Sequence, residues 1–203
     1  MIKVTLLGDS IRLIGYGTKV PEMLGENFEV FQPSVNCKFA KFTLRGLFDW
    51  DADMAGTRIV HWNNGLWDIC DLFGDGPFSS EMEYVETMSR IADLLLKKYD
   101  RVIFATTTPV SPQNPYNSNA LAERYNAALV PVLKQKGVII NDLYPLVAAD
   151  IDAYICEDHI HLSPKGIEVC ARQVADAILS AAKTLKDASQ PSAETAKHIG
   201  APV

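Results

Sequence analysis

Short apolar runs alternate along the chain with longer segments in which apolar residues recur every three or four positions. The short runs have the length and the β-branched content of strands, whereas the longer segments have the periodicity of helices. The predicted strands are residues 3–7, 28–31, 58–62, 101–105 and 138–140. Because strands and helices alternate, the sequence predicts an α/β fold with a central five-stranded parallel sheet.

Two of the predicted helices carry recognisable start signals. Ser80 and Glu83 have the spacing of a capping box ahead of a segment with helical periodicity. Ser163 has the position of an N-cap, and Pro164 that of the first residue of the last helix. We therefore expect one helix after the third strand and another close to the end of the domain.

The arrangement of helices between parallel strands predicts a three-layer, flavodoxin-like, doubly wound fold. A third helix is expected over residues 119–136, with a kink or break near Ala127 because Pro131 lies inside it. In such folds, binding and catalytic sites collect at the carboxyl ends of the strands. Motifs that carry chemistry should therefore lie directly after a strand.

The composition fits one globular domain with a sizeable core. The chain has 203 residues, of which 48% are hydrophobic and 22% charged. We expect the domain to span residues 1–186, and the polar segment 187–203, which contains Pro and Ser, to be a flexible tail. The net charge is −6 without a cluster of Lys and Arg, which argues against nucleic acid as a partner.

The four cysteines form no CxxC pair, so neither a zinc ribbon nor a redox motif is expected. We expect reduced and mostly buried thiols. No apolar run reaches membrane-spanning length, and the first residues lack the pattern of a signal peptide. The sequence thus predicts a soluble, cytoplasmic protein with no membrane partner, unless a signal peptide has been removed from it, in which case it would be secreted or periplasmic.

The first chemically interesting cluster is Gly8-Asp9-Ser10, directly after the first predicted strand. Gly8 permits a sharp turn that presents the Ser10 hydroxyl at the sheet edge. A serine hydroxyl becomes a good nucleophile only when a base takes its proton. By itself this tripeptide is more typical of a turn or a helix cap.

The second cluster, His61-Trp62-Asn63-Asn64-Gly65, ends the third predicted strand. A side-chain amide held there can donate hydrogen bonds to an oxyanion that develops during a reaction. The simpler interpretation is that Asn64-Gly65 is only a turn.

The third cluster, Asp158-His159-Ile160-His161, comes just before the last helix. A carboxylate near a histidine can fix its tautomer and stabilise the imidazolium. A capped surface loop is the simpler alternative. A metal site with His159 and His161 is another, although no matching partner is obvious elsewhere in the sequence.

Together, and in this order, the three clusters resemble the blocks of the SGNH/GDSL hydrolases, a superfamily of esterases and lipases. Gly8-Asp9-Ser10 is similar to the first block, and Asp158 to His161 is similar to the last block, Asp-x-x-His. The resemblance covers residues 1 to about 185.

Two departures from the family pattern affect the expected oxyanion hole. The third block usually begins with glycine, where this chain has His61, and we align the oxyanion asparagine with Asn63, with Asn64 as the alternative. The second block normally supplies a glycine N–H, but residues 32–39 contain no glycine. We place that donor at Cys37.

The resemblance implies a Ser-His-Asp triad in which His161 takes the proton of Ser10 and Asp158 orients His161. It also implies that the N–H groups of Ser10 and Cys37 and the amide of Asn63 hold the oxyanion. No metal or organic cofactor is implied.

Four further residues are candidates for substrate contact. Arg12 follows the nucleophile closely in sequence, although a structural or surface role is common for such an arginine. Trp62 and Trp67 offer aromatic surface for an acyl group or a sugar, with core packing an equal alternative for Trp62. Asn64 is the remaining candidate.

The function implied by the resemblance is a serine esterase for small, acetyl-type acyl esters. By family analogy, acetylated carbohydrate is one substrate class. An acyltransferase with the same serine chemistry is the alternative, and a non-enzymatic flavodoxin-like binding module is a further one. The expected partner is a small-molecule ester.

Overall fold

The computed structural model describes residues 1–185, and the predicted tail over 187–203 lies outside the described residues. Five parallel strands form one sheet in the order β2-β1-β3-β4-β5. They are β1 (Ile2–Leu7), β2 (Phe28–Phe31), β3 (Thr57–Trp62), β4 (Arg101–Ala105) and β5 (Ile139–Asn141). The predicted five-stranded parallel sheet is confirmed, and each strand boundary lies within one residue of the prediction.

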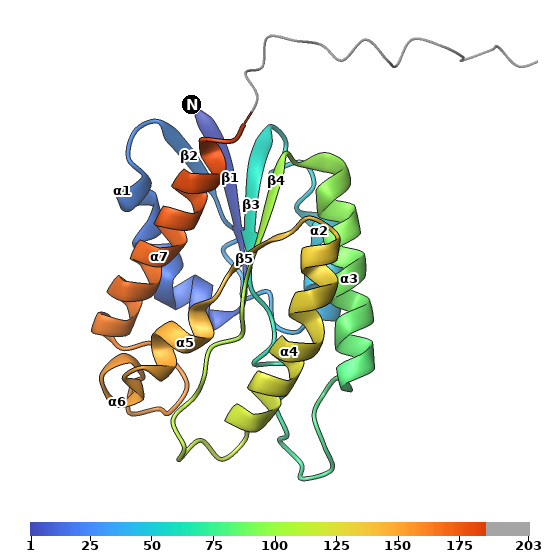
Figure 1. The fold of residues 1–203 in the computed structure, drawn as a ribbon, viewed down its shortest axis with the longest axis vertical. Helices are drawn as coiled ribbons and strands as arrows, with labels where there is room; N and C mark the ends of the chain where they lie inside the picture. Colours follow the sequence, from blue (N-terminus) through green and yellow to red (C-terminus); the bar gives the residue numbers. More distant parts are fainter. Residues whose placement is uncertain (186–203) are drawn as a thin grey trace, which may run out of the picture.

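Helices cover both faces of the sheet and complete three layers (Figure 1). One face carries α2 (Ala40–Asp49), α3 (Glu81–Lys98) and α4 (Asn119–Gln135), which pack on one another in that order. The other carries α1 (Val20–Leu24), α5 (Leu143–Ala148) and α7 (Pro164–Ala182), with the short α6 (Ile151–Tyr154) beside α5 and α7. This strand order and layering are those of the flavodoxin-like doubly wound fold, as predicted.

Both predicted helix starts are present. The Ser80 side chain accepts a hydrogen bond from the Glu83 N–H while the Glu83 carboxylate accepts one from the Ser80 N–H, which completes the capping box of α3. At the start of α7, the Ser163 hydroxyl accepts a hydrogen bond from the Gly166 N–H. The N-cap of α7 fixes the point at which the preceding loop joins the helix.

Of the kink or break predicted near Ala127, the break does not occur: α4 continues through Pro131 as one helix. Leu129 and Leu133, on either side of the proline, are fully buried. Their burial stabilises α4 against the loss of the single hydrogen bond that proline cannot donate.

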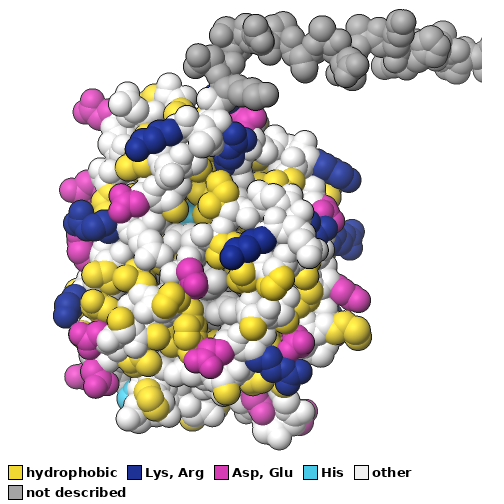
Figure 2. Space-filling view, in the orientation of Figure 1, with side chains coloured by type: hydrophobic (Ala, Val, Ile, Leu, Met, Phe, Trp, Pro, Cys, Tyr) yellow, Lys and Arg dark blue, Asp and Glu magenta, His cyan; other side chains and the backbone are white. Residues whose placement is uncertain are grey.

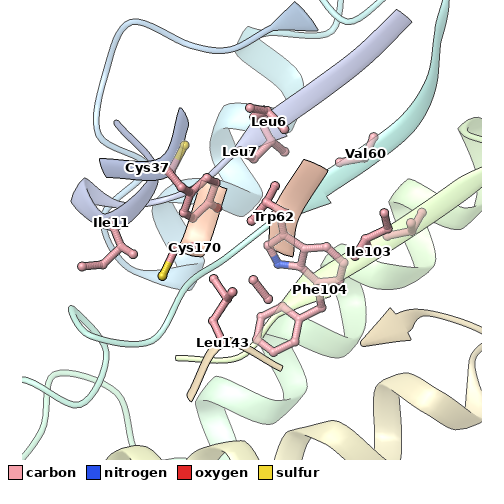
Figure 3. Packing of buried hydrophobic residues seen from close by; sticks show 14 of the residues in the cluster. Leu6, Leu7, Ile11, Cys37, Val60, Trp62, Ile103, Phe104, Leu143 and Cys170 are labelled. Carbon is pink, nitrogen blue, oxygen red and sulfur yellow. The ribbon is translucent and has the colours of Figure 1, made fainter. Parts of the chain in front are cut away.

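The core lies on both sides of the central strands β1, β3 and β4. Trp62 is completely buried, and its ring lies 5.1 Å from that of Phe104 on the neighbouring strand. Figure 3 shows these rings packed among side chains from both faces, including Leu6, Leu7, Val60 and Ile103. The loops that follow these strands therefore start from a rigid base.

Candidate active site

Ser10 lies on a tight turn directly after β1. It opens a short π-helical segment, η1 (Ile11–Gly15), at a position where a backbone N–H has no partner within the helix. The Ile11 N–H donates to Asp9 Oδ1 at 2.9 Å, which stabilises the turn. Ser10 is half-buried, and no hydrogen bond within residues 1–185 engages its Oγ. The hydroxyl is therefore available to a base or a substrate.

Gly8 is needed because the Asn63 side chain lies close against its backbone, and not because the turn requires a left-handed φ. Its backbone does not adopt a left-handed φ. A Cβ at this position would lie 2.0 Å from Asn63 Oδ1 and 2.8 Å from Arg12 Cβ. The sequence pattern identified the right residue, but its physical role is to let the Asn63 side chain lie against the backbone of the turn.

The loop before α7 holds a carboxylate and an imidazole in direct contact. His161 Nδ1 lies 2.7 Å from Asp158 Oδ2. Asp158 Oδ1 also accepts the N–H groups of Ile160 at 3.1 Å and His161 at 2.9 Å. Partial burial raises the pKa of Asp158, but these hydrogen bonds outweigh that effect and hold it below its usual value. A carboxylate at Nδ1 places the proton there and leaves Nε2 as the basic nitrogen.

Backbone hydrogen bonds give this loop a fixed shape. The Cys156 N–H donates to the His161 carbonyl at 2.7 Å, and the His159 N–H donates to the Cys156 carbonyl at 2.9 Å. His159 has a left-handed φ of 68°, and its carbonyl accepts the N–H of Ser111 at 3.1 Å and the side-chain amide of Asn114 at 3.3 Å. The His159 backbone thus ties the loop to the segment after β4.

The acid–base loop lies against the nucleophile turn. A Cβ added at Gly15 would lie 3.4 Å from Leu162 Cδ1 and 3.8 Å from the Ser10 carbonyl oxygen. Burial raises the pKa of Asp9 to about 6, and the charge of His161 is among the smaller effects that lower it. No hydrogen bond within the described residues joins Ser10 to His161, and in hydrolases this bond often tightens only in the substrate complex.

Asn63 is held at both ends of its amide. Its Oδ1 accepts the Tyr16 hydroxyl at 2.7 Å, and its Nδ2 donates to Asp9 Oδ1 at 2.8 Å. Its backbone N–H donates to the Leu7 carbonyl at 3.2 Å, which extends the register between β1 and β3. One of the two Nδ2 hydrogens remains for another acceptor. Tyr16 was not identified from the sequence, because an isolated tyrosine after a turn carries no pattern of its own.

The prediction that the Cys37 N–H completes an oxyanion hole is wrong. Cys37 is fully buried, and its N–H already donates to the Gly8 carbonyl at 3.0 Å. The following residue, Lys38, has a left-handed φ of 49°, and its N–H donates to Asn36 Oδ1 at 2.7 Å. Cys37 instead holds the segment between β2 and α2 against the nucleophile turn.

Arg12 is not open to a substrate, because its side chain is completely buried. Its guanidinium donates to the carbonyls of Pro33 at 2.8 Å, Val35 at 2.8 Å and Gly8 at 3.0 Å. The prediction of a substrate contact is therefore wrong, and the structural alternative holds. Arg12 links the segment after β2 to the turn that carries Ser10.

Among the other predicted contact residues, only Trp67 reaches the surface substantially, with 39% of its area exposed. Trp62 belongs to the core, so its prediction as a pocket residue is wrong. Asn64 is 1% exposed, and its Nδ2 donates to the Lys38 carbonyl at 2.9 Å, which gives it a structural role.

Two further buried titratable groups lie around the site. Burial lowers the pKa of His61 to about 3, and its Nε2 accepts the Asn141 side-chain amide at 3.1 Å, so the ring is neutral. Burial raises the pKa of Asp68 to about 7. Its carboxylate accepts the Ala40 N–H at the start of α2 and the Ser79 hydroxyl at 2.8 Å. Asp68 therefore joins the loops that follow β2 and β3.

Within residues 1–185, no group of three or more His, Cys, Asp or Glu side chains is arranged to hold a metal ion. No helix in the same part of the chain is both long and apolar enough to span a bilayer. Figure 2 shows charged side chains of both signs scattered among hydrophobic ones on the face that carries α4, α5 and α7.

A groove of about 820 Å³ lies between α2 and α3, and Ser10 is not among its lining residues. It is bordered by apolar side chains such as Leu44, Phe48 and Leu94 and contains none of the residues described above. The groups suited to catalysis therefore do not line this groove.

Comparison with family models and with curated proteins gives no match. Solved structures do match, at low sequence identity. A lipase/acylhydrolase from Enterococcus faecalis has a TM-score of 0.76 and 16% identity, over 89% of this chain and 96% of that one. An acetylxylan esterase from Geobacillus stearothermophilus has a TM-score of 0.73 and 15% identity, over 87% and 94%. Another acetyl xylan esterase has a TM-score of 0.69 and 19% identity, over 89% and 99%.

These likenesses extend over nearly the whole of each chain. They confirm the predicted SGNH/GDSL-type fold, with its parallel five-stranded sheet between two layers of helices.

Proposed function

We propose that this protein is a carboxylic ester hydrolase in which Ser10 is the nucleophile, His161 the general base and Asp158 its orienting carboxylate. The observation that supports this most directly is the 2.7 Å contact between Asp158 and His161 in a loop packed on the Ser10 turn. A fold shared with esterases and acylhydrolases supports the reaction class.

In the proposed reaction, Ser10 Oγ attacks the ester carbonyl carbon while its proton passes to His161 Nε2. The Asp158 carboxylate stabilises the resulting imidazolium. The free Nδ2 hydrogen of Asn63 and the Ser10 N–H donate to the oxyanion. Collapse of the tetrahedral intermediate expels the alcohol, which takes its proton from His161. Water, deprotonated by His161, then cleaves the acyl-enzyme and restores Ser10.

We further propose small, acetyl-type esters as substrates, with acetylated carbohydrate as one class. Two of the similar structures are acetylxylan esterases by name. The exposed Trp67 ring and the half-exposed Tyr116 ring offer surfaces on which a sugar can stack.

The test compares Ser10→Ala with Ser34→Ala, an exposed serine in the segment after β2. Hydrolysis of p-nitrophenyl acetate should be abolished in the first variant and unchanged in the second. A fluorophosphonate probe should label the unsubstituted protein and Ser34→Ala but not Ser10→Ala. Retained hydrolysis by Ser10→Ala would rule out the nucleophile assignment. Adding sugar or alcohol acceptors to the assay distinguishes a hydrolase from an acyltransferase.

A further inference from the structure

The Asn63 side chain is fixed by two buried partners that approach its amide from opposite ends. Tyr16 OH donates to Oδ1 at 2.7 Å, and Asp9 Oδ1 accepts from Nδ2 at 2.8 Å. Tyr16 is 0% exposed, Asp9 1% and Asn63 5%, so water does not compete for these bonds. Reversing the amide would point its carbonyl oxygen at the Asp9 carboxylate, which accepts hydrogen bonds and repels another acceptor.

The hydroxyl of Tyr16 is suited to remain a donor. Burial raises the pKa of Tyr16 well above its ordinary value, so the phenol keeps its proton at neutral pH. Its ring packs edge-on against the neutral His61 ring at a centroid distance of 5.5 Å. The ring therefore has little freedom to move the hydroxyl away from Asn63.

We propose that Tyr16 is a positioning residue that acts through Asn63. Its hydrogen bond keeps the amide nitrogen directed toward the carbonyl oxygen of the substrate and polarises the amide so that its remaining N–H is a stronger donor. Tyr16 itself touches neither the substrate nor the reacting atoms. The inference rests on the proposed function, because it requires Asn63 to be an oxyanion donor.

The test is a double-mutant cycle of Tyr16→Phe and Asn63→Ala. Asn63→Ala should lower kcat by about 10²–10³. Tyr16→Phe should lower kcat by about tenfold with little change in KM, because a more weakly held donor affects the transition state more than the bound ester. In the Asn63→Ala background, Tyr16→Phe should change kcat by less than about twofold, since its route of action is gone.

Tyr125→Phe is the matched control. The Tyr125 hydroxyl is also buried and donates to a backbone carbonyl, that of Ser79, at 2.7 Å. Removing it takes away a comparable hydrogen bond elsewhere, so kcat should not change.

A second readout needs no substitution of Tyr16. In the unsubstituted protein, the Tyr16 hydroxyl proton should give a slowly exchanging NMR signal that is lost or strongly shifted in Asn63→Ala. A signal unaffected by that substitution would overturn the inference, as would equal effects of Tyr16→Phe in both backgrounds or an unchanged kcat in Tyr16→Phe. If Asn63→Ala itself left kcat unchanged, the oxyanion assignment would fail instead.

Discussion

The two halves of the candidate site differ in burial and in whether their hydrogen bonds join separate segments of the chain. On the nucleophile side, Asp9, Arg12 and Asn63 are at most 5% exposed and are bonded to one another or to backbone of several segments. On the acid–base side, the side chains of Asp158 and His161 are 49% and 30% exposed. Their hydrogen bonds come mainly from within their own loop.

Because of this difference, substitutions on the two sides should affect the stability of the fold and the rate of the reaction differently. Substitutions on the acid–base side should affect the reaction and leave the fold nearly unchanged, because little apolar surface or buried hydrogen bonding is lost. Substitutions of Asp9, Arg12 or Asn63 on the nucleophile side should affect both, since each removes a group that joins two or more segments.

On the acid–base side, the largest effect on activity is expected for His161→Ala. Loss of the general base should lower kcat by about 10⁴, while the free energy of unfolding should change by no more than about 0.5 kcal/mol. Steady-state kinetics and urea unfolding measure the two quantities. The matched control is His159→Asn, because asparagine tolerates the left-handed φ of that residue. A near-inactive control together with an active His161→Ala would move the base to His159.

On the nucleophile side, Gly8→Ala should destabilise the protein by about 3 kcal/mol, because the new methyl group would overlap Asn63 Oδ1. It should also lower kcat, as Asn63 is displaced. Ser10→Ala, on the same turn, removes an unbonded hydroxyl and should leave the unfolding free energy unchanged. Comparable stability of Gly8→Ala and the wild type would contradict the tight packing of this turn.

The smallest effect expected is a change in how the free energy of unfolding depends on pH. The pKa of Asp68 is raised to about 7, above its ordinary value, so its protonated form favours the folded state. That contribution is present below about pH 4 and is lost as the pH rises through about 7. The lowered pKa of Asp158 acts with the opposite sign, so its contribution is lost as the pH falls below its ordinary value.

The check is the free energy of unfolding measured by urea between pH 5 and 8. It should fall less steeply with pH in Asp68→Asn than in the wild type. Asp158→Asn should leave the slope in this range unchanged, because Asp158 is ionised throughout it. Identical slopes for Asp68→Asn and the wild type would mean that Asp68 is not buried as described.

The sheet could be predicted from the sequence because its strands are short apolar runs, which are typical of strands buried on both faces. The capping box of α3 and the N-cap of α7 could also be predicted, because each depends on residues only three apart in the chain. Pro131 shows the opposite case. Its predicted break is overridden by Leu129 and Leu133, whose burial is a property of the tertiary packing.

In the candidate site, the sequence indicated that Ser10 and Asn63 follow strands and that the Asp158–His161 pair precedes the last helix. It did not indicate which distant groups Arg12 and Cys37 bond. Arg12 donates to the carbonyls of Pro33 and Val35, and the Cys37 N–H donates to that of Gly8, in each case about 20 to 30 residues away on another loop. Nor did the sequence indicate Tyr16, whose partner Asn63 lies 47 residues further along. Local patterns identify single residues, whereas pairings between loops depend on the finished fold.

The close packing of Gly8 and Asn63 has a consequence for the history of sequences that share this fold. The space that a side chain at residue 8 would need is filled by the amide of residue 63. The two positions therefore cannot vary independently, and a lineage that gained a side chain at the first would have to shorten the second. In a set of related sequences, glycine at position 8 and asparagine at position 63 should be retained together or replaced together.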